Sequence, residues 1–137
     1  MEEVKRKKPY GLWVALILIG VIIVIWIVSM LLKPKIDYDS MAKELFNYAY
    51  TFDNVDKIEA VDDDIFHITV KSDPWYIASE KDKMIFCKKM NEGITLICQK
   101  YKTIRDIDRA AVYYYDSKGI KVAEPAKAVT LESKILH

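Results

Sequence analysis

The sequence predicts an α+β domain that follows one transmembrane helix. Three observations lead to this fold class: an uncharged apolar run over residues 11–32, a segment at 65–71 in which apolar and polar side chains alternate, and apolar residues at intervals of three or four over 79–101. The predicted elements of the domain follow the order helix, strand, strand, helix, strand, strand. We therefore expect a four-stranded, mainly antiparallel sheet with the helices on one face.

The apolar run over residues 11–32 is the predicted transmembrane helix. A helix of this length spans about 33 Å, close to the roughly 30 Å hydrocarbon core of a bilayer. A cleaved signal peptide is the alternative, but its apolar core is normally about 7–15 residues long and ends in small residues. The stretch IVSMLLKP at 27–34 offers no such cleavage site. The run therefore favours a single-pass signal-anchor that stays in the cell membrane.

Basic residues are distributed unevenly around this run. Four of them occupy positions 5–8, whereas fewer follow the run over a longer stretch. Because basic residues are enriched on the cytoplasmic side of membranes, residues 1–10 are expected to be a cytoplasmic N-terminus. Residues 33–39 (KPKIDYD) form a short juxtamembrane linker. Residues 40–137 are then the extracytoplasmic domain.

The first helix of the domain is predicted over residues 40–50. Asp39 precedes it and is a typical N-cap, because its side chain can accept a hydrogen bond from a backbone N–H of the first turn. Met41, Leu45 and Tyr48 recur at intervals of three or four. One side of this helix is therefore apolar, as expected of a helix that packs on a sheet.

The first two strands are predicted over residues 57–61 and 65–71. The three aspartates at 62–64 favour a turn between them, because their carboxylates bond locally to the backbone. Side chains alternate along the second strand, and its core face consists of Phe66, Ile68 and Val70. His67 lies on the opposite face.

The longest helix of the domain is predicted over residues 79–101, after a turn or helix start at Asp73 and Pro74. Ser79 followed by Asp82 fits a capping box. The apolar stripe expected to cover the sheet consists of Met84, Cys87, Met90, Ile94, Cys98 and Tyr101. Ile85 and Leu96 lie on the opposite side. Either the first helix or the C-terminal tail covers them, or they form a docking ridge for a partner.

The last two strands are predicted over residues 109–115 and 120–123, joined by a turn that ends at Gly119. Pro125 ends the final strand or marks it as an edge strand. Residues 126–137 carry conflicting signals, for a short strand and for a helical turn, and are left unassigned.

No catalytic, metal or cofactor site is predicted. His67 lies outside any nucleophile motif, so a surface histidine is the favoured interpretation. Cys87 and Cys98 are about 16 Å apart on one helix, too far to bridge or to share a metal, and are expected to be buried thiols. The aspartates at 62–64 lack the spacing of a calcium loop. The protein is therefore not expected to be an enzyme.

Charge excludes one class of partner. Acidic and basic residues nearly balance over residues 33–137. Phosphate binding needs a basic face, so no nucleic acid partner is expected. The apolar run contains no small-residue motif for helix pairing, so the sequence predicts no oligomeric state.

Aromatic and exposed residues suggest an interaction surface. Tyr113, Tyr114 and Tyr115 place at least one ring on each sheet face. Ordinary strand composition, and a tryptophan that fills the edge of the core, are the alternative explanation. The candidate interaction surface consists of Trp75, Tyr76, Ile85, Leu96, Arg105, Tyr113 and Tyr115.

Arg105 belongs to the stretch TIRDIDR, which holds two arginines and two aspartates. Such a stretch can bind a carboxylate, a phosphate or the charged rim of a partner. Internal pairing of Arg105 with Asp108, or of Asp106 with Arg109, is the simpler explanation.

These observations favour a membrane-anchored interaction or accessory module that binds a protein partner in a membrane or envelope complex. The alternative is a membrane-anchored ligand-binding or sensing domain for a small molecule, a wall fragment or a lipid headgroup. Its contacts would be Trp75, Tyr76 and Arg105.

Overall fold

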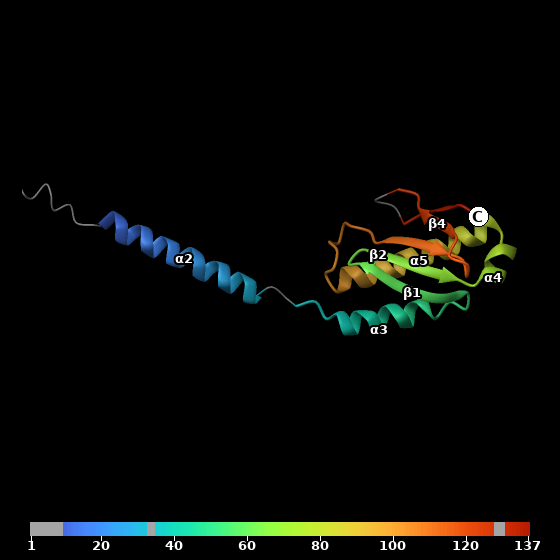
Figure 1. Cartoon of the computed structure of the whole chain (residues 1–137), viewed down its shortest axis with the longest axis horizontal. Coiled ribbons are helices and arrows are strands. Elements are labelled where there is room, and N and C mark those ends of the chain that lie inside the picture. The colour runs from blue at the N-terminus through green and yellow to red at the C-terminus, as the bar shows by residue number, and fades with distance from the viewer. Residues whose placement is uncertain (1–9, 33–34, 128–130) are drawn as a thin grey trace, which may run out of the picture. The chain divides into compact units, whose positions relative to one another are not determined.

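The computed structural model describes residues 10–32, 35–127 and 131–137. The chain divides into two compact units, Met1–Lys35 and Ile36–His137. The first unit contains helix α2, Tyr10–Leu32 (Figure 1). Its segment Gly11–Leu32 has a mean hydropathy of 3.2 and none of its residues is buried. The helix is thus long and apolar enough to cross a membrane, and it is apolar on all sides.

The second unit is built on a five-stranded mixed sheet with strand order β1-β2-β3-β4-β5. The strands are β1 (Val55–Asp62), β2 (Ile65–Val70), β3 (Ala111–Tyr115), β4 (Lys121–Pro125) and β5 (Ser133–Ile135). The expectation of four mainly antiparallel strands is wrong on two points. The tail contributes β5, and β2 pairs with β3 in parallel. The helical connection between β2 and β3 returns the chain to the same end of the sheet, which makes the two strands parallel.

The helices of this unit are α3 (Tyr38–Ala49), α4 (Ser72–Ile77) and α5 (Glu80–Lys100). Helix α3 begins earlier than predicted, because its N-cap is Asp37 rather than Asp39. The carboxylate of Asp37 accepts hydrogen bonds from the Ser40 backbone N–H at 3.1 Å and from the Ser40 hydroxyl at 2.8 Å. These bonds lower the pKa of Asp37.

Helix α5 agrees closely with its prediction. The side chain of Ser79 caps it by accepting the Asp82 backbone N–H at 3.1 Å. The middle of the predicted stripe is fully buried, at Cys87, Met90, Ile94 and Cys98. The ends of the stripe are not, since Met84 is exposed and Tyr101 is half-buried. The helix therefore covers the sheet along its central three turns.

All three helices contribute to one core on one face of the sheet. Leu45 from α3, Trp75 from α4 and Ile94 from α5 belong to the same buried cluster as the sheet residues Phe66 and Tyr114. The predicted core face of the second strand is confirmed, because the side chains of Phe66, Ile68 and Val70 are all buried. None of the described helices of this unit packs on the opposite face, which is called the open face below (Figure 1).

Candidate functional site

A cluster of aromatic and charged side chains occupies the open face. The parallel register places His67 beside Tyr113, and alternation along β3 puts Tyr115 on the same face. The ring of His67 lies 5.8 Å from that of Tyr113 and 4.9 Å from that of Tyr115, between centroids. The Lys121 ammonium lies 5.6 Å above the Tyr113 ring. These residues, together with Glu124, are called the open-face cluster.

The charges of this cluster neutralise each other. Lys121 Nζ and a Glu124 carboxylate oxygen are 2.9 Å apart. The hydrogen bond between them raises the pKa of Lys121 and lowers the pKa of Glu124. All five side chains of the cluster are half-buried. The cluster thus presents aromatic rings in contact with one another beside a neutralised Lys121–Glu124 pair, a surface suited to contact with another protein.

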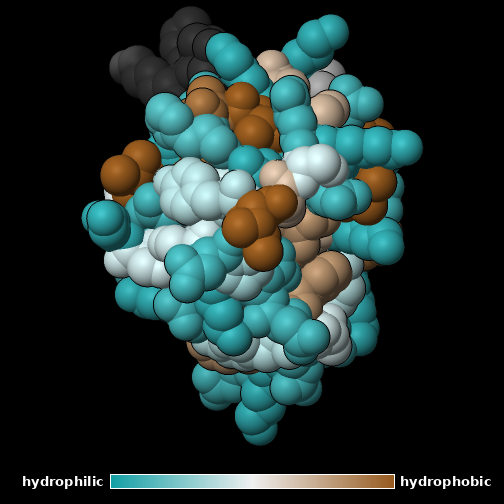
Figure 2. Space-filling model, turned by 90° about the vertical axis from the view of Figure 1, so that its right-hand side faces the viewer, coloured by the Kyte–Doolittle hydropathy of each residue, from teal (hydrophilic) through white to brown (hydrophobic). Residues whose placement is uncertain are grey.

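The two aromatic residues of α4 point in different directions. Trp75 is buried, and its indole N–H donates to the His137 carbonyl oxygen at 3.0 Å. Its expected place on an interaction surface is therefore wrong, because the ring fills the core beside Phe86. Tyr76 is exposed, and its hydroxyl donates to Asp116 Oδ2 at 2.7 Å. Figure 2 shows this end of the domain, where apolar side chains form small separate patches among hydrophilic ones.

The two aliphatic residues on the outer side of α5 are exposed. Ile85 retains 44% of its accessible surface and Leu96 retains 65%. The expectation that the first helix or the tail covers them is wrong for the part of the chain that the structure describes. Eleven residues separate them, about 16 Å along the helix, so they do not form one continuous apolar patch. Leu96 borders a surface cavity of about 300 Å³ that Arg109 and Glu92 also line.

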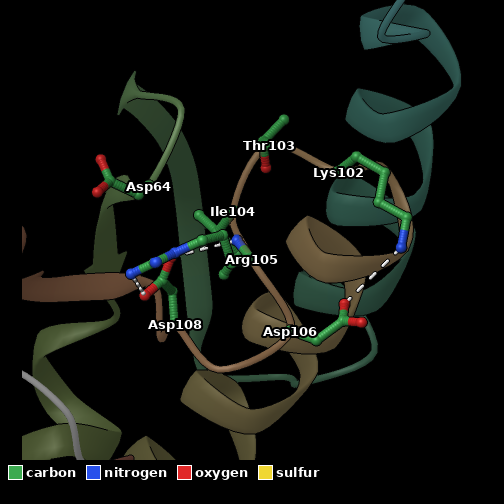
Figure 3. A pocket seen from close by; sticks show the side chains of 7 residues that line it. All are labelled: Asp64, Lys102, Thr103, Ile104, Arg105, Asp106 and Asp108. Atoms are coloured by element: carbon green, nitrogen blue, oxygen red, sulfur yellow. Dashed lines mark hydrogen bonds and ion pairs between the residues drawn. The ribbon is translucent and has the colours of Figure 1, made fainter. Parts of the chain in front are cut away.

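Arg105 lies in the loop between α5 and β3, at a surface cavity of about 460 Å³ (Figure 3). Its guanidinium binds the carboxylate of Asp108 through two contacts, Nε–Oδ2 at 2.9 Å and Nη2–Oδ1 at 3.1 Å. This contact lowers the pKa of Asp108. On the far side of the loop Lys102 turns toward Asp106, at 3.8 Å. Both cations of the cavity are therefore paired within it, and Asp64 adds a negative charge, so an anion is disfavoured.

The predicted pairing of Arg105 with Asp108 is confirmed. The predicted pairing of Asp106 with Arg109 is wrong. The carboxylate of Asp106 pairs instead with Lys102, four residues earlier in the sequence. The Arg109 guanidinium instead donates to the Asp108 carbonyl oxygen at 3.0 Å. The charged side chains of this stretch therefore make their contacts within the loop itself.

The structure does not bring together Trp75, Tyr76 and Arg105, the three residues expected to contact a ligand. Tyr76 follows the carboxyl end of β2, whereas Arg105 precedes the amino end of β3. Because these two strands are parallel, the two residues lie at opposite ends of the sheet. The third residue, Trp75, is buried in the core and is not available to a ligand at the surface.

Both cysteines are buried and free, as predicted. Burial raises the pKa of Cys87 to about 12 and that of Cys98 to about 11. The predicted aspartate turn is also present at Asp63 and Asp64, with Asp62 ending β1. Within the described ranges, no group of three or more histidine, cysteine, aspartate or glutamate side chains could hold a metal ion.

One surface feature was not predicted from the sequence, a groove between α3 and β1. Two adjoining cavities of about 230 and 60 Å³ make up this groove and share the side chains of Ala42, Leu45, Ala60 and Phe66. A sequence signal for it exists in α3, where Tyr38, Ala42 and Phe46 follow each other at intervals of four beside the core stripe. This second stripe gives α3 an apolar side wider than its core contact.

Comparisons with protein-family models, with curated proteins and with solved structures find no match to the chain. The candidate surfaces are therefore those that the geometry supplies: the open-face cluster and the α3–β1 groove.

Proposed function

We propose that the protein is a single-pass membrane protein whose domain binds another protein, as an interaction or accessory module of a membrane or envelope complex. Two features support the anchor: the length of α2 and the apolar character of its whole circumference. The basic residues at positions 5–8 support a cytoplasmic N-terminus in the cell membrane and an extracytoplasmic domain.

The open-face cluster is the observation that carries the binding role. Tyrosine rings supply large contact area, and only two side-chain torsions must be fixed when they bind. In this cluster the rings of Tyr113 and Tyr115 are already held by His67 and Lys121. Binding would therefore cost little side-chain entropy. A binding role is also favoured over catalysis, because Lys121 and Glu124 of the cluster are paired with each other.

Site-specific photocrosslinking tests the binding role. Benzoylphenylalanine replaces Tyr113 in the full-length protein in its native membrane, and a matched sample carries it at Ile107, an exposed position in the loop between α5 and β3. We expect one discrete adduct from position 113 that position 107 does not give, and the same partner in stoichiometric amount after mild detergent extraction. Recovery of the protein alone, or identical adducts from both positions, would contradict the proposal.

Protease protection tests the topology separately. A tag placed after His137 should be digested in intact cells, once any outer membrane has been opened, and the protein should stay in the membrane fraction after alkaline washing. Protection of the tag until the cytoplasmic membrane is breached would reverse the proposed orientation. It would move the search for the partner to the cytosol.

A further inference from the structure

The groove between α3 and β1 is lined mostly by apolar side chains and is open to solvent. On its helix side Tyr38 and Phe46 are 52% and 46% exposed, although both rings border the groove. On its strand side Ala60 is exposed, although its pairing with Phe66 places it on the covered face of the sheet. The groove therefore lies at the margin of the packed core, with the core residues Leu45 and Phe66 in its lining, and an apolar ligand would find exposed surface there.

The strand beside this groove is an edge strand. Within the described part of the domain, β1 pairs with β2 alone, and Figure 1 shows α3 running along it. The pairing is regular from Lys57 to Ala60, between two irregularities. An edge strand carries backbone N–H and C=O groups that have no partner on the outer side. A row of unused hydrogen-bonding groups thus lies next to an apolar groove, the combination that an extended peptide uses when it adds a strand to a sheet.

The charges around the groove indicate which kind of peptide fits. Asp62 and Asp63 line one end, and no basic side chain lines either of its two cavities. The hydroxyl of Tyr38 lies 3.3 Å from Asp63 Oδ1 and joins the start of α3 to the β1–β2 turn at that end. A basic residue of the ligand would meet these carboxylates.

The same charges disfavour a second copy of this chain as the occupant. Strand β1 carries Asp56, Glu59 and Asp62 against a single lysine, Lys57, which lies 3.7 Å from Glu59. Pairing of β1 with itself would bring two acidic strands together, and like charges that face each other across strands are destabilising.

We propose that an extended segment of a partner protein adds to β1 as a further strand, with apolar side chains at alternate positions in the α3–β1 groove and a lysine or arginine at the end near Asp62 and Asp63. Backbone hydrogen bonds to β1 would supply affinity, while the groove and the two carboxylates would set specificity. This surface is distinct from the open-face cluster, so the proposal holds or fails independently of the role given to that cluster.

Random twelve-residue peptides displayed on phage provide the probe. They are selected on the full-length protein in nanodiscs of zwitterionic lipid, with counter-selection against the Ala42→Trp variant, in which the larger side chain fills the groove. Unchanged thermal unfolding of this variant confirms that it is folded. We expect enriched sequences in which apolar residues alternate and one end is basic. No enrichment, or enrichment of acidic sequences, would overturn the proposal.

The most enriched peptide is then synthesised with a fluorophore, and its binding is measured by anisotropy. A second form carries N-methyl groups on alternate backbone nitrogens, which removes donors from one edge of the peptide. Two such forms, one for each set of alternate nitrogens, cover both edges, and we expect one of them to lose at least tenfold in affinity. Equal binding of all three forms would overturn strand addition.

A charge variant tests the acidic end of the groove. In Asp62→Asn/Asp63→Asn the amide oxygens still accept the local hydrogen bonds from the Asp63 backbone N–H and from Tyr38. Two surface contacts of this kind should weaken the affinity about three- to tenfold. The matched control, Asp73→Asn/Glu80→Gln, removes two exposed charges near α4 and should leave the affinity unchanged. An equal loss in both variants would show nonspecific attraction and overturn the proposed orientation of the peptide.

Discussion

The Tyr114 hydroxyl donates a hydrogen bond to Asn91 Oδ1 over 2.6 Å, inside a core where both residues are almost free of solvent contact. The amide nitrogen of Asn91 in turn donates to the Leu131 carbonyl oxygen at 2.7 Å and to the Ser133 hydroxyl at 2.8 Å. One asparagine of α5 thus joins the central strand β3 to the edge strand β5. These bonds add to the backbone pairing with β4 that holds this strand of three residues in the sheet.

Replacement of this asparagine should therefore destabilise the domain. Asn91→Leu leaves the Leu131 carbonyl oxygen and the Ser133 hydroxyl without their partner, and we expect the free energy of unfolding to fall by about 2–3 kcal/mol. Urea unfolding, followed by Trp75 fluorescence in a Trp13→Phe/Trp26→Phe background, measures it. The exposed control Lys88→Leu should stay within about 0.5 kcal/mol of the parent protein. An unchanged midpoint for Asn91→Leu would show that the network contributes nothing.

Gly93 determines how closely α3 approaches α5. A Cβ atom at this position would lie 2.0 Å from Cζ of the Tyr48 ring, whose hydroxyl donates to the Lys89 carbonyl oxygen at 2.6 Å. Although alanine favours helix over glycine by about 1 kcal/mol, Gly93→Ala should be destabilising, because the clash costs about 1–3 kcal/mol or more. In a Tyr48→Ala background the same change should become neutral or stabilising. Additive losses in the double variant would rule out this contact as the cause.

Local sequence patterns predicted the elements that depend on neighbouring residues. The cap at Ser79, the stripe of α5 and the pair Arg105–Asp108 each involve residues a few positions apart, and all three are present. Capping, helical period and short-range ion pairing act within one or two turns, so a single sequence contains the necessary information.

Two local predictions were wrong, the N-cap of α3 and the partner of Asp106, but the larger features that were missed depend on contacts between distant segments. Strand β5 pairs with β4 and is bonded to Asn91, about forty residues earlier in the sequence. Trp75 packs on Phe86 in the core, and the tail returns to accept its indole N–H at His137. The α3–β1 groove exists because α3 covers Ile58 but leaves Ala60 exposed. None of these contacts follows from the period or the propensity of one segment.

The hydrogen bond from Tyr76 should make stability depend on pH. It lowers the pKa of Asp116, and the backbone N–H groups of Ile120 and Lys118 lower it further. An unfolded aspartate titrates near pH 3.9, so the unfolded chain takes up this proton first as the pH falls. The stabilisation is complete above that pH and is lost as the pH falls through the lower folded value.

The comparison of wild type with Asp116→Asn isolates this group from the other carboxylates. We expect the wild type to have the higher denaturation temperature at pH 6 and the difference to shrink between about pH 4 and pH 2. A constant difference across the range would mean that Asp116 stabilises the turn without a change in its ionisation.

The buried thiols should resist modification while the domain is folded. Because the thiolate is the reactive form, the raised pKa values of Cys87 and Cys98, about 12 and 11, leave very little of it at pH 8. Reaction with a chromogenic disulfide reagent should be more than about a hundredfold slower than for an exposed cysteine, for which Lys81→Cys on the outer side of α5 is the reference. In urea both native thiols should react at the reference rate. Rapid labelling of either native thiol under folding conditions would show that the core around α5 opens far more readily than its packing implies.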